Sequence, residues 1–145
     1  MNIAFQPLDD IEGLLRPESR GEEAVWYAAA QEGRLVYTRC SECSAGHLPL
    51  RPMCPRCGSI AVSVVESAGR GAVYSYTVQH RRPAAEVPVP NIVALIDLDE
   101  GFRMLSRIEH TEPDAVTVGA RVEVRFARCH DTVAPVFVLA GEKEQ

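Results

Sequence analysis

Two pairs of closely spaced cysteines constrain the fold of this chain more than any other feature. Cys40 and Cys43 form one C-x-x-C pair, Cys54 and Cys57 form another, and ten residues separate the two pairs. Two cysteines at this spacing on a tight turn can direct both sulfurs at one ion, and two such turns complete a tetrahedron of thiolates. Because four thiolates leave no open coordination position, the spacing predicts one structural zinc ion.

Two other uses of these cysteines are a redox dithiol and a pair of disulfides. A redox C-x-x-C usually occurs singly at a helix N-terminus, whereas this chain has two pairs beside predicted short strands. The acidic N-terminal stretch lacks the basic start of a secretory signal, so we expect a cytoplasmic protein, in which disulfides are rare. His47 lies close to the pairs, but four cysteines already fill a zinc shell.

Residues 1–33 have the pattern of an N-terminal helical extension. Glu22 and Glu23 suit the start of a helix and Gly33 suits its end. Trp26 falls on one helical face with two alanines, at the i, i+3, i+4 spacing of a packed face, whereas Tyr27 points about 100° away. Packing is one use of this aromatic pair, and contact with a partner protein is the other. A second, short helix is predicted around residues 9–15.

The rest of the chain is predicted to be mainly β. Residues 34–60 read as two short hairpins that carry the cysteines, and residues 61–145 contain five β-branched or aromatic-rich segments bounded by turn residues. The clearest strand is 121–126, where apolar and charged residues alternate strictly. Five strands in about 80 residues fit a five-stranded OB-fold barrel, although an SH3-like barrel or a small sandwich fits nearly as well.

The distribution of charge bears on the possible partners. The formal net charge is −5, but residues 34–82 hold seven arginines and two glutamates. Such a positive centre could attract a phosphate-bearing ligand or an acidic surface. Single-stranded nucleic acid is one alternative ligand, because Tyr74 and Tyr76 are expected on one strand face and could stack bases. The acidic pI of about 5.4 argues against it. No apolar run approaches the ~20 residues that cross a membrane.

The ordered set of motifs resembles a known family. It runs through the aromatic helix, Gly33-Arg34-Leu35, both cysteine pairs, Gly69 to Val78, a proline-rich loop, Ile92 to Gly101, Val118 to Val122 and Pro135-Val136-Phe137. Over roughly residues 22–140 the chain resembles the acyl-CoA-associated OB-fold family, a domain of unknown function preceded by a rubredoxin-like zinc ribbon. Two positions depart from the family pattern. Ser44 stands where glycine is common, and Asn91 follows Val89-Pro90 where tyrosine is common.

The resemblance implies a role in acyl-CoA metabolism without independent catalysis. Proteins of this family are similar to small accessory subunits that bind thiolase-like enzymes, among them lipid-transfer-type aldolases of sterol side-chain breakdown. It therefore implies a hetero-oligomer in which the chain supports binding or turnover of an acyl-CoA thioester. His80, Arg81 and Arg82 end a predicted strand and could hold the phosphates of CoA. Trp26 and Tyr27 are the candidate partner contacts. A third, less favoured hypothesis is an enzyme that acts without a partner and uses Cys129 or His80 for catalysis.

Overall fold

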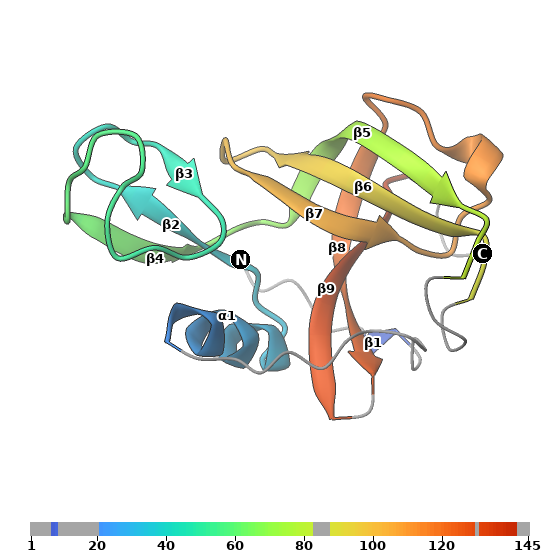
Figure 1. Cartoon of the computed structure of the whole chain (residues 1–145), viewed down its shortest axis with the longest axis horizontal. Coiled ribbons are helices and arrows are strands. Elements are labelled where there is room, and N and C mark those ends of the chain that lie inside the picture. The colour runs from blue at the N-terminus through green and yellow to red at the C-terminus, as the bar shows by residue number, and fades with distance from the viewer. Residues whose placement is uncertain (1–6, 9–20, 83–87, 130, 142–145) are drawn as a thin grey trace.

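The computed structural model describes residues 7–8, 21–82, 88–129 and 131–141. The predicted helix around residues 9–15 therefore lies outside the described residues. One α-helix, two sheets and a short 3-10 helix make up the described part (Figure 1). No helix in these ranges is both long and apolar enough to cross a membrane.

Five strands form a closed barrel, as the sequence predicts. They are β5 (Arg70–Gln79), β6 (Asn91–Leu98), β7 (Arg103–Ile108), β8 (Arg121–Cys129) and β9 (Thr132–Leu139). Strand β5 pairs with β6 and β8, and the barrel closes where β9 pairs antiparallel with β8 and parallel with β7. The 3-10 helix η1 (Pro113–Ala115) lies between β7 and β8. A closed five-stranded barrel of this order is an OB-fold, which confirms that expectation over the sandwich.

The barrel interior is filled by alternate strand residues. Val122, Val124 and Phe126 on β8 are buried, as their strict alternation predicts, and Ile96 and Phe137 complete the centre of this cluster. The two-residue strand β1 (Pro7–Leu8) adds to the outside of β8 in parallel.

The second sheet carries the cysteines. Its three strands are β2 (Val36–Cys40) in the centre, β3 (Gly46–His47) on one side and β4 (Val62–Glu66) on the other. All pairings are antiparallel, and β4 matches β2 over five consecutive residue pairs. Strand β4 begins at Val62. The ribbon sheet therefore includes residues from the segment 61–145, in which the sequence analysis expects the barrel strands.

Ribbon, helix and barrel share one hydrophobic core. Helix α1 (Glu22–Gln31) buries Ala29 and Ala30, and Trp26 packs partly buried beside them, as the helical spacing predicts. Tyr37 of β2 stacks on Phe102 of the barrel, with ring centroids 4.4 Å apart and planes 14° from parallel. Since both rings are buried, the ribbon is packed onto the barrel.

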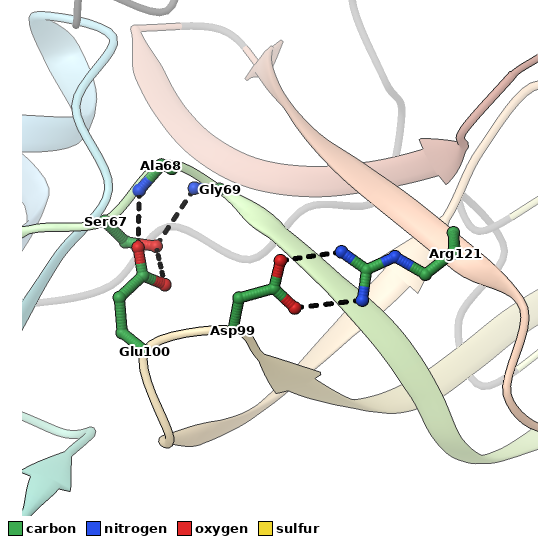
Figure 2. A network of polar contacts seen from close by, with 6 residues as sticks. All are labelled: Ser67, Ala68, Gly69, Asp99, Glu100 and Arg121. Carbon is green, nitrogen blue, oxygen red and sulfur yellow. Dashed lines mark hydrogen bonds and ion pairs between the residues drawn. The ribbon is translucent and has the colours of Figure 1, made fainter.

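The turn between β6 and β7 is hydrogen-bonded to the segment that connects the ribbon to the barrel (Figure 2). Glu100 accepts a hydrogen bond of 2.8 Å from Ser67 Oγ through Oε1 and one of 2.7 Å from the Ala68 N–H through Oε2. Asp99 receives two hydrogen bonds from the Arg121 guanidinium of β8, which lowers the pKa of its carboxyl. Glu100 thus binds the connection between β4 and β5, and the adjacent Asp99 binds β8.

A β-bulge corrects one expectation about the tyrosines. Val73 pairs with Ile96 and Ser75 with Leu95, so Tyr74 is extra on its strand. After the bulge Tyr76 pairs with Ala94 and shares the face of the core, whereas the ring of Tyr74 lies 3.4 Å from the guanidinium carbon of Arg103 on the outer face. The prediction that both rings share one face is therefore wrong.

Candidate metal centre and apolar cavity

The two cysteine pairs converge as their spacing predicts. All four sulfurs lie within 4.8 Å of one another, with 3.6 Å between those of Cys40 and Cys57 and 3.6 Å between those of Cys43 and Cys54. A tetrahedral zinc with Zn–S bonds of about 2.3 Å places its sulfurs about 3.8 Å apart. The donor set and its size therefore fit one zinc ion. The four cysteines are positioned to bind one metal ion in a closed shell, and a zinc there supplies structural cross-linking.

Each cysteine pair lies on a turn of the same geometry. The N–H of Ser44 donates to the carbonyl of Cys40, and the N–H of Gly58 donates to the carbonyl of Cys54. Ser44 and Gly58 have φ of 64° and 78°, a left-handed conformation that glycine adopts without cost. The family departure at Ser44 thus falls on a turn residue, and the ligand cysteines of that turn still reach the cluster.

Backbone N–H donors lower the pKa values of two of the four thiols. Backbone N–H groups of Cys43 and Glu42 lower the pKa of Cys40 despite burial. Burial acts to raise the pKa of Cys54, but the N–H groups of Cys57 and Arg56 and the imidazole of His47 lower it to about 6. Without a cation the four groups cannot all ionise, which is the electrostatic reason such a cluster takes a metal.

His47 contacts the cluster from β3 as an outer partner. Its Nε2 lies 3.2 Å from the sulfur of Cys54, within hydrogen-bond distance. A ring nitrogen in this position stabilises the thiolate of Cys54 by a hydrogen bond. The four sulfurs remain the metal ligands.

An open apolar cavity of about 560 Å³ lies where helix, ribbon and barrel meet. Trp26 and Tyr27 of α1 line one wall and contact each other edge to face, with ring centroids 4.9 Å apart. The ribbon segment 48–50 and residues 103–105 of β7 line the others. Burial, followed by the charge of Glu23, raises the pKa of Tyr27. Leu105 lies at the rim of the cavity and is 66% exposed. The sequence analysis did not identify it as a candidate residue.

The structure does not place the cationic residues of the predicted ligand loop at this cavity. His80, Arg81 and Arg82 are exposed just beyond the end of β5. Figure 1 shows β5 ending and β6 beginning at the far side of the barrel from α1. Trp26 and Tyr27 therefore lie together, whereas the predicted phosphate contacts lie at another end of the molecule.

Asn91, the second family departure, has a structural role at that barrel end. Its amide nitrogen donates to Gln79 Oε1 and its amide oxygen accepts from Arg107 Nε, both at 2.9 Å. The side chain is 8% exposed and links the ends of β5, β6 and β7. An asparagine can bridge a carbonyl and a guanidinium in this way because it is both donor and acceptor.

Comparisons with known proteins agree with this architecture. The family described as "ChsH2, rubredoxin-like zinc ribbon domain" matches residues 28–62, and that described as "ChsH2, C-terminal OB-fold domain" matches residues 64–127. The chain is 37% identical over 131 residues to a probable enoyl-CoA hydratase alpha subunit of Thermomonospora curvata, which is 90% of this chain and 41% of that protein. It thus spans less than half the length of that relative.

Two further relatives are covered more fully. A DUF35 domain-containing scaffold protein of Methanocaldococcus jannaschii is 32% identical over 105 residues, which is 71% of this chain and 74% of that protein. The solved structure of an Ltp2-ChsH2(DUF35) aldolase contains a chain of 37% identity that superposes with a TM-score of 0.78, covering 86% of this chain and 99% of that chain. By its zinc ribbon, its OB-fold barrel and these similarities, the chain belongs to the DUF35 family.

Proposed function

We propose that this chain is a non-catalytic accessory subunit of a thiolase-like enzyme complex that acts on an acyl-CoA thioester. The observation that carries the proposal is the cavity beside α1, where two aromatic rings, an arginine and an exposed leucine lie together. Tyrosine, tryptophan and arginine are the residue types that dominate binding energy at protein interfaces. The similarity over 99% of one chain of an Ltp2-ChsH2(DUF35) aldolase supports a partner of that kind.

The electrostatics of the barrel surface disfavour nucleic acid as the ligand. Arg103, Arg107, Arg121 and Arg125 each lie within 3.5 Å of an acidic side chain. A groove that tracks phosphates needs cations that are not already neutralised. The bulge at Tyr74 also separates the two tyrosines that would have stacked bases. The described surface therefore favours a protein partner over a single strand.

Co-expression with a thiolase-like protein from the same genome tests the proposal. We expect one stable complex on size-exclusion chromatography and turnover of the acyl-CoA substrate that requires the enzyme subunit. Turnover by this chain alone at the rate of the complex would contradict the assignment. Failure of every thiolase-like protein of that genome to bind would contradict it equally.

Replacing Leu105 with aspartate is expected to weaken the complex without unfolding the chain. The side chain is exposed at the cavity rim, so a carboxylate there stays hydrated in the free chain but must be desolvated in an interface. We expect the dissociation constant to rise by about tenfold or more, as at interface hot spots, measured by calorimetry or biolayer interferometry. Tyr27→Ala on the opposite wall should act in the same direction.

Val118→Asp is the matched control for that substitution. Val118 is 68% exposed on the barrel, close to the 66% of Leu105, but it does not line the cavity. Equal weakening by both variants would show a non-specific charge effect and would remove the cavity from the proposed interface. A lower melting temperature for Leu105→Asp alone would indicate a role in packing instead.

We also propose that His80, Arg81 and Arg82 contact the phosphates of CoA within the complex. Their exposure at one end of β5 supports this role, because guanidinium groups pair with phosphate in bidentate geometry. The double variant Arg81→Glu, Arg82→Glu should raise the KM for acyl-CoA by about tenfold or more, the loss expected for one or two charged hydrogen bonds, while leaving subunit assembly intact. An unchanged KM would remove the loop from substrate binding.

A further inference from the structure

Strand β4 forms an exposed edge of the ribbon sheet without the usual protection. Among the described residues its only hydrogen-bonded neighbour is β2, and it forms one edge of that sheet (Figure 1). Natural sheets protect such edges with lysine, proline, bulges or very short strands. The sequence Val62–Glu66 contains neither lysine nor proline, and its five residues pair with β2 without a bulge. An edge of this kind is suited to pair with another strand.

The unpaired backbone groups on this edge can be assigned from the register. The N–H of Ser41 donates to the carbonyl of Ala61, and the N–H of Ser67 donates to the carbonyl of Leu35. In an antiparallel ladder the residues that exchange these bonds alternate along the strand. Positions 61, 63, 65 and 67 therefore bond toward β2, while the N–H and C=O groups of Val62 and Val64 point away from the sheet.

The side chains of these same two valines line a groove. It has a volume of about 300 Å³ and runs between β4, the start of α1 and the ribbon segment 50–52. Val64 is 51% exposed there, and the adjoining Ile60 is 82% exposed. Free hydrogen-bonding groups and an apolar groove thus lie on the same stretch of chain, which is the arrangement used in β-strand addition.

The charges around the groove distinguish between occupants. Arg39 lies directly beside Ser63 in the β2–β4 register, and Arg51 lines the groove. Neither side chain forms an ion pair with a described residue, in contrast to the paired arginines of the barrel. A second copy of the chain added at this edge would bring these arginines near their own copies. Although Glu22 lies on the opposite rim, the face beside Ser63 is complementary to an acidic strand.

We infer that the β4 edge binds an extended segment of a partner protein, apolar at alternate positions and acidic between them. The apolar residues enter the groove beside Val62 and Val64. The acidic residues lie on the other face, where Ser63 is small enough to let Arg39 reach across it. The groove adjoins the cavity beside Tyr27, since Leu50 lines both, but no residue of β4 lines that cavity. The inference therefore does not depend on the enzyme partner proposed above.

A capped synthetic peptide that contains Val-Glu-Val-Glu-Val tests the inference on the full zinc-loaded chain. We expect it to shift the NMR amide signals of Val62 and Val64 and to slow their hydrogen exchange, with little change at Ser63 and Val65. The same peptide with lysine in place of glutamate should bind about tenfold more weakly or worse, since it places like charges opposite Arg39. Absence of binding by the glutamate peptide, or equal binding by both peptides, overturns the inference.

Substitutions at one position separate backbone pairing from side-chain contact. Val64→Pro removes the outward N–H without touching the bonds to β2, so zinc content and melting temperature should stay close to those of the parent chain. It should weaken peptide binding by about tenfold, whereas Val64→Thr, which keeps the N–H and the branched shape, should change it by no more than about threefold. Unchanged binding by Val64→Pro would show that the groove takes another structure, and would overturn strand addition.

Charge reversal provides a test that does not require the proline variant to fold. Arg39→Glu should reverse the preference between the glutamate and lysine peptides. A preference that stays the same overturns the predicted acidic character of the partner. A parent chain that dimerises in ultracentrifugation, and loses the dimer in Val64→Pro, would identify a second copy as the occupant and overturn the inference.

Discussion

Cys54→Ser is expected to release the metal and to unfold at least the ribbon. Cys54 is 1% exposed, and its sulfur lies 3.6 Å from that of Cys43, so a serine there removes one of the four ligands of the shell. Metal binding in such modules is worth on the order of 10 kcal/mol and is linked to their folding. Elemental analysis should find about one zinc per parent chain and far less in the variant.

The loss should extend beyond the ribbon, because Tyr37 and Leu35 belong to the same core as Phe102. Thermal unfolding followed by near-UV circular dichroism should therefore show a destabilised barrel as well. Cys129→Ser is the control, since Cys129 is in neither C-x-x-C pair. A parent protein that contains no metal when purified without chelator, or a Cys54→Ser variant with full zinc and unchanged melting, would contradict the prediction.

Gly71→Ala is expected to destabilise the barrel strongly although it adds one methyl group. Gly71 is buried on β5 opposite Leu98, and a Cβ at this position would collide with the backbone carbonyl of Asp97 on the neighbouring strand. A backbone atom held in a sheet cannot rotate aside, so the strands must separate. The free energy of unfolding should fall by about 2–3 kcal/mol or more, the upper range for added methylenes in packed cores.

Chemical denaturation of the zinc-loaded protein measures this effect. Gly119→Ala is a useful comparison, because a Cβ there meets no atom within 4 Å and only the positive φ of 88° opposes it. We therefore expect the smaller loss at Gly119, about 1 kcal/mol. Equal losses at the two glycines would show that the sheet accommodates the added methyl group at Gly71, and would contradict the prediction.

The metal ligands and the barrel strands could be predicted because short-range patterns encode them. The C-x-x-C spacing places two sulfurs on each turn whatever surrounds it, and the alternation of residues 121–126 defines which side chains fill the core. Helix α1 was predictable for the same reason, from Glu22 at its start to Gly33 after its end.

The remaining features depend on contacts between distant segments. The bulge at Tyr74 belongs to the pairing of β5 with β6, so it cannot be recognised from the alternation of one strand. Val62–Glu66 reads like another barrel strand, but its partner is β2, more than twenty residues earlier in the chain. The cavity was missed because Leu105 and Arg103 meet Trp26 and Tyr27 only when the barrel packs against the helix.

Because its two acids contact two separate segments, the β6–β7 turn is expected to tolerate changes in length poorly. Surface hairpins commonly accept inserted or deleted residues, because their tips contact little else. Here the Glu100 carboxylate accepts a hydrogen bond from the backbone N–H of Ala68, while the neighbouring Asp99 carboxylate accepts two from the Arg121 guanidinium. One additional residue would displace one carboxylate from its partner, whichever side of the pair it entered. The length of the hairpin tip therefore sets the spacing between the ribbon connection and β8.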